Sequence, residues 1–398
     1  MAIDRSLRFG SFLSPIHSPH EDPTLALHRD VELIQWMDRI GYDEVWIGEH
    51  HSTGWEYVAS PEVFLAFAAA KTERIKLGTG VVSLPYHHPF NVAERIVLLD
   101  HLTRGRMIFG VGPGALAYDA YLYGLESDEL RPMLEEKLDV VLALLRGERV
   151  TKKGKDYELR DAAIQLRPYS DPCFEIAVTC MISPSGARLA GRHGVSMLSL
   201  NATQSASVQS LRDNWRVSEE EAAKYGKSVD RANWRLVAPM HVAETAEQAR
   251  REVATGLSRW VYYNTKVGTL GIVPETASTT DDYIDSLIEN GFAVIGTPDD
   301  AAAQIERLWE SSGGFGTFLF WGHDWANREA TLRSHDLFAA EVAPRFRVHG
   351  RVLDQAERYA LQHRAELAPK AMQAREKARQ EYLAEKQPDS SEKASRLA

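Results

Sequence analysis

The sequence predicts an α/β protein: a single (β/α)8 TIM barrel with insertions on its carboxyl face and a C-terminal helical tail. Short apolar runs of strand type alternate with segments whose apolar residues recur at helical spacing, eight times in about 345 residues. So long an alternation favours a closed parallel barrel over an open sheet. We therefore expect the barrel over residues 1–347 and a helical, partly disordered extension over residues 348–398.

Each strand-helix unit follows from its own pattern. In the first unit, an apolar run stops at Pro15, and Leu27, Val31 and Ile34 then recur at helical spacing. The first four predicted strands are 7–15, 44–50, 75–84 and 106–112, with helices at 25–40, 60–71, 89–103 and 132–146. The last four are 173–180, 195–201, 234–243 and 316–322, with helices at 184–192, 204–225, 245–262, 298–311 and 325–342. Thr297 as N-cap and Pro298 in the first turn mark the start of the helix at 298–311.

Three segments exceed a minimal barrel, namely 113–131, 147–172 and 263–297, which are rich in Gly, Pro, Asp and Thr. The first follows strand four and should lie at the carboxyl face. The third lies there too if the helix at 298–311 is the one that packs on the barrel. Either could then cover a site as a lid. From about residue 354 the composition predicts a solvated helix, and the last dozen residues are expected to be disordered.

The composition narrows the class of function. A formal net charge of −10 argues against nucleic-acid binding, which requires clustered Lys and Arg. The two cysteines, Cys173 and Cys180, offer neither a disulfide framework nor a zinc-ribbon spacing. No apolar run approaches the ~20 residues of a membrane helix, and the first residues lack a signal-peptide pattern. We expect a cytoplasmic protein that acts on small molecules, with no nucleic-acid or membrane partner.

The second predicted strand ends in three ionisable residues, Glu49, His50 and His51. The carboxyl ends of barrel strands carry the chemistry of this architecture. Together with His87 and His88 these residues suggest a metal, but adjacent strand residues point to opposite faces, so at most one of His50 and His51 faces the barrel mouth. We favour no metal and a single His as general acid or base, or as a hydrogen-bond donor to a cofactor. A structural His that holds a loop stays open as the alternative.

Two further segments are candidates for cofactor binding. Ser183, Ser185 and Gly186 stand at a helix start after a strand, where hydroxyls, free N–H groups and the helix dipole suit a phosphate. An ordinary Ser N-cap is the alternative. The run Gly110–Gly114 is not a dinucleotide fingerprint, because Pro113 intervenes and an irregular segment follows. Around Gly112 it could let a flat ring approach the backbone, or it could be a tight turn.

Aromatic residues gather on the same face. Trp321 stands at the end of the last predicted strand, and we place it against a ligand ring. Trp55, Tyr57 and Tyr86 lie on carboxyl-side loops, and with Glu49 they are predicted to line the substrate pocket. Such a pocket suits a planar cofactor and a hydrophobic substrate.

Taken together, these motifs resemble the bacterial luciferase-like family of flavin-dependent monooxygenases, from Arg8 to about Arg345. The resemblance rests on Gly-Glu-His-His at 48–51, Leu84-Pro-Tyr-His-His-Pro-Phe90, Leu99-Asp-His-Leu-Thr-Arg-Gly-Arg106, the Gly110–Gly114 loop and the segment 183–194. Within the family, the run Gly110-Val-Gly-Pro-Gly-Ala115 and the ending Phe320-Trp-Gly-His-Asp-Trp-Ala326 resemble the limonene 1,2-monooxygenase branch.

The resemblance implies roles for individual residues. His50 stands where the family has its catalytic His, close to the reactive edge of the flavin. Gly80 and Val81 stand where the family bends the backbone against the isoalloxazine ring, often through a non-proline cis peptide. Ser183 and Gly186 stand at the phosphate. Luciferase has an Arg after strand four that helps hold the phosphate, and this chain has Pro113 there, so that contact must differ.

The implied reaction uses two components. A separate flavin reductase supplies reduced FMN, oxygen adds to give a flavin hydroperoxide, and one oxygen atom passes to a hydrophobic molecule such as a terpene, a ketone or an aldehyde. The rivals are a deazaflavin-dependent dehydrogenase of the same superfamily, a flavin-binding protein without turnover, and a metal-dependent barrel hydrolase that uses His50 with His87 or His88. By analogy with the family, we expect a homodimer that pairs through helices two and three.

Overall fold

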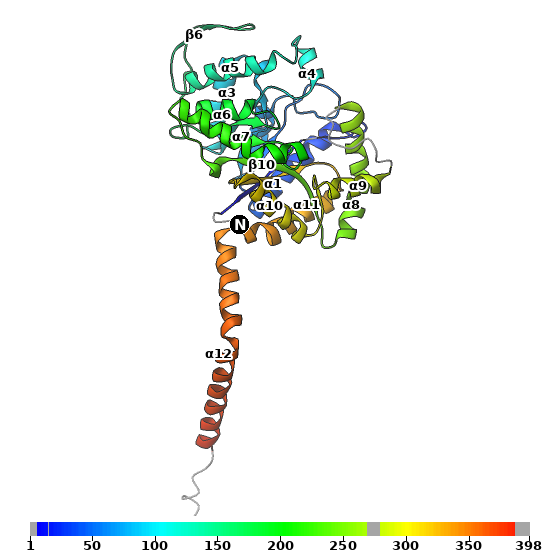
Figure 1. Ribbon diagram of the computed structural model, residues 1–398, viewed down its shortest axis with the longest axis vertical. Helices are drawn as coiled ribbons and strands as arrows, with labels where there is room; N and C mark the ends of the chain where they lie inside the picture. Colours follow the sequence, from blue (N-terminus) through cyan, green and yellow to red (C-terminus); the bar gives the residue numbers. More distant parts are fainter. Residues whose placement is uncertain (1–5, 15, 269–278, 387–398) are drawn as a thin grey trace, which may run out of the picture. The chain divides into compact units, whose positions relative to one another are not determined.

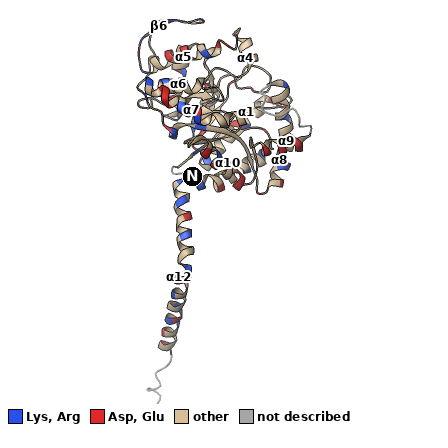
Figure 2. Cartoon of the chain, viewed as in Figure 1, with Lys and Arg blue, Asp and Glu red and all other residues tan. Residues whose placement is uncertain are grey.

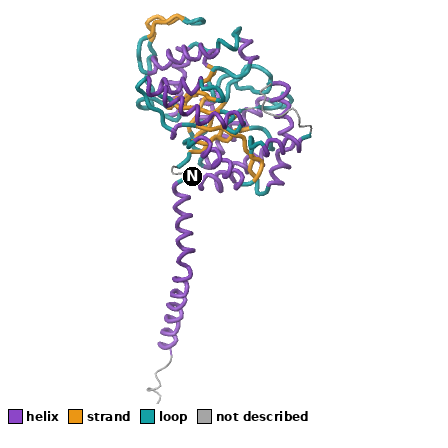
Figure 3. Tube along the Cα trace, viewed as in Figure 1, coloured by secondary structure: helices purple, strands orange, loops and turns teal. Residues whose placement is uncertain are grey.

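Eight parallel strands close into a barrel. The computed structural model describes residues 6–14, 16–268 and 279–386. Helices surround the strands (Figures 1 and 3). The predicted fold is therefore confirmed. Every neighbouring pair is parallel, and the ring closes where β12 pairs with β1 and β9 pairs with β10. The barrel strands are β1 (Arg8–Leu13), β2 (Glu44–Ile47), β3 (Lys76–Thr79), β5 (Met107–Gly112), β8 (Glu175–Cys180), β9 (Ser196–Ser199), β10 (Arg235–Val242) and β12 (Thr317–Gly322).

The surrounding helices begin and end at the expected local signals. Asp22 caps the first helix by accepting from Leu25 N–H, and Gly41, in the left-handed region with φ of 90°, ends it. The predicted start at Thr297 is a capping box with Asp300. The helices are α1 (Pro23–Ile40), α2 (Pro61–Ala69), α3 (Pro89–Thr103), α5 (Leu130–Leu145), α6 (Ser185–His193), α7 (Ser205–Lys224), α8 (Ala246–Tyr262), α10 (Pro298–Ser312) and α11 (Arg328–Leu337).

The core has two layers, one between strands and helices and one inside the barrel. Phe12, Trp46 and Leu319 fill the interior. At the amino end of the strands, the buried guanidinium of Arg235 forms a bidentate pair with Glu44, with Nε–Oε1 and Nη2–Oε2 distances of 2.9 Å. This pair fills the barrel at the amino ends of the strands and the apolar side chains fill its interior, so ligand chemistry is confined to the carboxyl ends of the strands.

One predicted strand and the three insertions differ from expectation. The strand predicted at 75–84 is broken into β3 and β4 (Val82–Ser83) because the peptide between Gly80 and Val81 is cis. The first insertion contains α4 (Ala117–Leu122), and the second is an antiparallel hairpin of β6 (Val150–Lys153) and β7 (Glu158–Ala162). The third contains a π-helix, η3 (Tyr263–Val267), then α9 (Thr280–Glu289) and β11 (Val294–Gly296), which pairs with β10. Residues 269–278 of the expected lid lie outside the described residues.

The chain divides into two units, Met1–Arg347 and Val348–Ala398. The second contains the predicted tail helix, α12 (Val348–Lys386), which begins six residues before the expected position and includes Pro369. None of its described residues is buried, and its acidic and basic residues are interspersed along its length (Figure 2). The expected disorder falls on residues 387–398, outside the described residues. Within the described residues, no helix is long and apolar enough to span a bilayer.

Candidate active site

His50 lies between two carboxylates at the carboxyl end of β2. Its Nδ1 is 2.9 Å from Oδ2 of Asp119, and its Nε2 is 3.4 Å from Oε2 of Glu56. The side chain is 18 % exposed, so it is largely removed from water but still reachable. Both ring nitrogens of the predicted catalytic His therefore face acidic groups, a geometry typical of a proton donor or acceptor.

Asp119 belongs to α4, in the insertion after β5. Besides His50, its carboxylate accepts hydrogen bonds from the His51 N–H (3.1 Å) and the Ser52 hydroxyl. Burial raises the pKa of this carboxyl, but the hydrogen bonds from His50 and Ser52 outweigh burial and the net pKa is lowered. Asp119 is therefore an ionised anchor for the His50 ring.

Glu56 connects His50 to the third insertion. Its Oε1 accepts a 2.6 Å hydrogen bond from the Tyr263 hydroxyl, and Tyr263 is the first residue of η3. Tyr263 is completely buried, and burial and the neighbouring carboxylate raise the pKa of its phenol. The phenol thus stays protonated and fixes the orientation of Glu56 toward His50.

The charge state of His50 follows from these neighbours. Burial lowers the pKa of the imidazole, whereas Glu56 and Asp119 raise it, and the net pKa lies above the ordinary value of 6.5. The raised pKa favours the imidazolium form of His50, whose Nδ1 is held by Asp119. Its Nε2 contact with Glu56 is longer than an ordinary hydrogen bond, which leaves that proton for another oxygen acceptor.

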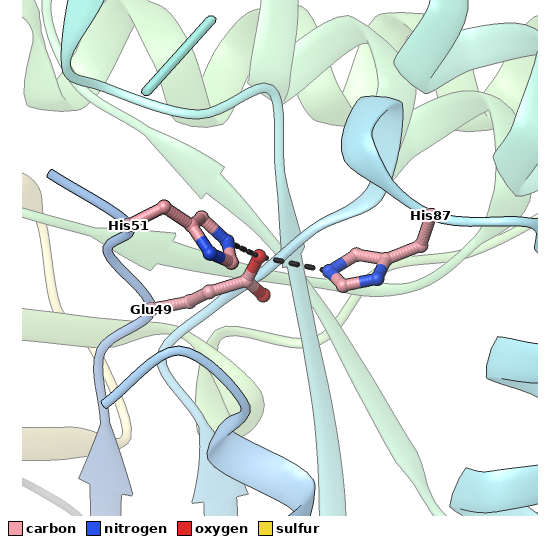
Figure 4. Close-up of side chains that lie close together, drawn as sticks. All are labelled: Glu49, His51 and His87. Atoms are coloured by element: carbon pink, nitrogen blue, oxygen red, sulfur yellow. Dashed lines mark hydrogen bonds and ion pairs between the residues drawn. The ribbon is translucent and has the colours of Figure 1, made fainter. Parts of the chain in front are cut away.

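Glu49 is buried and does not line a substrate pocket, which corrects the prediction for this residue. Its Oε1 accepts from the Nε2 atoms of His51 and His87, both at 2.8 Å, and its Oε2 accepts from the Ser83 N–H at 3.0 Å (Figure 4). Burial raises the pKa of the Glu49 carboxyl, but the hydrogen bonds from His51 and His87 outweigh burial and the net pKa is lowered, so the carboxyl stays ionised. Glu49 thereby ties the end of β2 to β4 and to the segment after it.

The ligand atoms of Glu49, His51 and His87 also lie within 4.8 Å of one another, as metal ligands would. Here each is already hydrogen bonded within the group. The ligand set expected for a metal-dependent hydrolase, His50 with His87 or His88, is not brought together, because His50 faces Asp119 and the His88 ring packs against Tyr157. His50 and His51 bind different carboxylates, Asp119 and Glu49 respectively.

The ends of β3 and β5 offer bare backbone to a flat ring. The Gly80–Val81 peptide is cis, as the resemblance implies, and it lies directly before β4. At Gly112 a Cβ would be 2.7 Å from both Thr179 Oγ1 and Val81 Cγ2. The Thr179 and Val81 side chains thus fill the direction that a Cβ would take, so only glycine fits here. The backbone that glycine leaves bare suits a flat ring such as the isoalloxazine of a flavin.

The start of α6 fits a phosphate. Pro184 is the N-cap and makes no side-chain cap, and Ser185 is the first helical residue, so the ordinary Ser N-cap is not formed. The exposed Ser183 hydroxyl lies 3.2 Å from that of Ser185. A Cβ at Gly186 would be 2.0 Å from the Thr179 carbonyl oxygen, so glycine lets the helix start lie against the end of β8. Hydroxyls and uncapped N–H groups together form an anion-binding helix terminus.

The predicted pocket aromatics divide into two groups. Trp55 packs on Tyr263 with ring centroids 5.6 Å apart, and Tyr86 stacks on Tyr123 at 4.7 Å, so both lie beside the His50 cluster. Trp321 is buried edge-on against Trp260 and donates its indole N–H to Ser14.

Tyr57 lies elsewhere. Its hydroxyl donates to the Ser18 carbonyl and its ring contacts His17, so it packs against the loop after β1 and is not part of the His50 cluster. A cavity of about 570 Å³ also lies on that side, between α1 and α11.

Sequence reasoning missed Asp119, Glu56, Tyr263 and Tyr123. Each comes from a segment without periodicity at the sequence level. One signal in the sequence pointed to Asp119. This acidic residue stands in the segment directly after strand four, and that segment must cross the barrel mouth.

The chain matches a known protein family over most of its length. The model of the family described as luciferase-like monooxygenase matches residues 7–314. Limonene 1,2-monooxygenase from Rhodococcus erythropolis is 51 % identical over 338 residues, 85 % of this chain and 86 % of the relative. The 4-hydroxyprotoasukamycin monooxygenase from Streptomyces nodosus subsp. asukaensis is 44 % identical over 345 residues, 85 % of this chain and 92 % of the relative.

A solved structure gives the same result. The oxygenating constituent of the 3,6-diketocamphane monooxygenase from Pseudomonas putida, a type II Baeyer-Villiger monooxygenase in complex with FMN, superposes with a TM-score of 0.71 at 27 % identity. The match covers 85 % of this chain and 98 % of that one. By its sequence, its barrel and the arrangement of its site, the chain belongs to the luciferase-like monooxygenase family.

Proposed function

We propose that this protein is a flavin-dependent monooxygenase that uses reduced FMN and molecular oxygen to oxygenate a hydrophobic small molecule such as a terpene, a ketone or an aldehyde. The observation that supports this most is His50, which is held between Asp119 and Glu56 beside the glycine-lined ends of β3 and β5. Relatives named as monooxygenases at 51 % and 44 % identity support the same reaction class.

Six residues would hold FMN. Gly80, Val81 and Gly112 would face the ring, and Ser183, Ser185 and Gly186 would bind the phosphate. Reduced FMN supplies the two electrons with which one atom of oxygen enters the product and the other leaves as water. We propose that a separate flavin reductase delivers it through a transient contact.

The protein contributes a positioned proton and a site closed to water. His50 in its imidazolium form donates the Nε2 proton to the oxygen atom that departs, while Asp119 holds Nδ1 and so keeps the ring in place. The buried Trp55 and Tyr263 beside it exclude water, which would otherwise compete for that proton.

We also propose that the protein is a homodimer that pairs through α2 and α3. These helices pack side by side and expose large apolar side chains: Val63, Phe67, Leu98 and Leu102. Such a patch is typical of a subunit interface. Analytical ultracentrifugation would test it. A dimer that Phe67→Glu and Leu102→Glu together convert to monomer is expected, and a wild-type monomer would refute it.

The function is tested with protein, FMN, a flavin reductase and isotopically heavy oxygen, against a panel of terpenes, ketones and aldehydes. The expected product carries one heavy oxygen atom. His50→Ala should still bind FMN but release most of the reducing equivalents as hydrogen peroxide, whereas the matched variant His88→Ala should not. Turnover without oxygen, supported by a deazaflavin, would replace this proposal with the dehydrogenase.

A further inference from the structure

The short helix α4 has its polar contacts on one side and its aromatic residues on the other. Asp119 and the Tyr123 hydroxyl point inward to His50 and His51. Tyr118, Tyr121 and Leu122 point outward, and Tyr121 is 82 % exposed. This is the reverse of a surface helix that buries its apolar face, so the outward side chains are available to a ligand.

These outward residues line a cavity of about 390 Å³ with Lys266 and Val267 of η3. The volume is in the range of small-molecule sites, and the walls are mainly aromatic or aliphatic. Ser52 and Thr53 also line it. Because the Ser52 hydroxyl donates to Asp119, which binds His50, one cavity wall is directly connected to the proposed proton donor.

Lys266 gives the cavity a single charge. Among the described residues that line the cavity, it is the one ionisable side chain apart from the tyrosine phenols, and none is a carboxylate. Within residues 6–14, 16–268 and 279–386, the Lys266 side chain forms no ion pair or hydrogen bond. A lone ammonium at the edge of an aromatic cavity favours a ligand with an apolar body and an anionic end.

We propose that this cavity binds the organic substrate, and that the substrate is an apolar, ring-containing molecule with an anionic oxygen group at one end. The aromatic side chains of α4 contact the rings and Lys266 contacts the anion. The inference rests on the proposed monooxygenase function and adds the location and charge class of its substrate. It also requires that FMN and this ligand bind together, because none of the residues assigned to FMN lines the cavity.

Calorimetric titration with two probes tests this without turnover, cofactor or oxygen, so its outcome is independent of whether oxygenation occurs. Anilinonaphthalene sulfonate has an aromatic body and one anionic group, and N-phenylnaphthylamine is its uncharged analogue. Tyr121→Ala should weaken both probes roughly three- to tenfold. Lys266→Met should weaken the sulfonate about two- to fivefold and leave the uncharged probe unchanged.

Matched controls keep the result interpretable. Tyr225→Ala removes another exposed tyrosine, Lys153→Met removes a lysine on the β6–β7 hairpin, and neither should change either affinity. Saturating FMN should not displace the probes. Absence of binding, displacement by FMN or an unchanged affinity in Tyr121→Ala would overturn the site, and equal effects of Lys266→Met on both probes would overturn the anionic class.

Discussion

At the scale of single residues, the structure distinguishes His50, the proposed proton donor, from His51. Both follow β2, but their side chains bind different partners. His51 and His87 share the Glu49 carboxylate. His50 alone faces two carboxylates and keeps a ring nitrogen in a loose contact. Alternation along a strand predicted the divergence, but the partners come from residues 56 and 119, which no local pattern links to residue 50.

Replacing Asp119 by Asn should shift the pH dependence of coupling. The carboxylate is one of the groups that raise the pKa of His50, so its loss lowers that pKa. Since the proton donor is the imidazolium, the yield of product per reduced FMN falls as pH rises through the pKa. In the variant this fall should begin at lower pH, as measured by peroxide release across a pH series. A profile that falls at the same pH as wild type would remove Asp119 from this role.

A second buried His should govern stability at alkaline pH. His17 bonds Asp30 at 2.9 Å and Asp324 at 2.6 Å, and although burial lowers its pKa, these carboxylates raise it to about 10. A raised pKa stabilises the fold below the unfolded value of about 6.5, and that contribution is lost as pH rises toward 10. His17→Gln should cost about 3 kcal/mol near neutral pH, because it leaves Asp30 buried without a cation. Urea unfolding should show the gap to wild type narrowing at high pH, and a constant gap would contradict the assignment.

At the scale of elements, the strands and main helices follow from periodicity and caps, whereas the site depends on breaks in those patterns. The strand expected at 75–84 stops at Gly80–Val81, a backbone conformation that apolar periodicity cannot indicate. The segment 263–297 was expected as an insertion rich in Gly, Pro, Asp and Thr, and no helix was predicted in it, yet Thr279 and Asp282 form a capping box for α9 that the sequence displayed. The inward position of α4 could not be predicted, since it depends on contacts between distant segments.

Lys137 of α5 holds the segment that carries His87. Its buried ammonium donates to the carbonyls of Pro85 and His87 and to Asp156. Lys137→Met leaves these acceptors unpaired and should lower the free energy of unfolding by about 2–4 kcal/mol. Lys153→Met on the exposed hairpin is the control and should be neutral. Denaturant titration measures both, and equal stability of the two variants would show that Lys137 is dispensable.

At the scale of the whole molecule, the barrel core and the long helix α12 are separate units. Residues 348–386 include no buried side chain, while the core clusters lie within residues 7–346. A chain ending at Arg347 should therefore keep its thermal midpoint and its FMN affinity. Calorimetry on both lengths measures this, and a clear loss of thermal stability would mean that the tail contributes to the fold.

The central proposal is that the barrel binds reduced FMN and controls its reaction with oxygen. The most direct measurement is rapid mixing of the protein and photoreduced FMN with oxygenated buffer, followed by absorbance. We expect an absorbing species that differs from reduced and oxidised FMN and persists longer than free flavin takes to oxidise, and a shorter-lived one in His50→Ala. Oxidation at the rate of free FMN, in wild type and variant alike, would contradict the account.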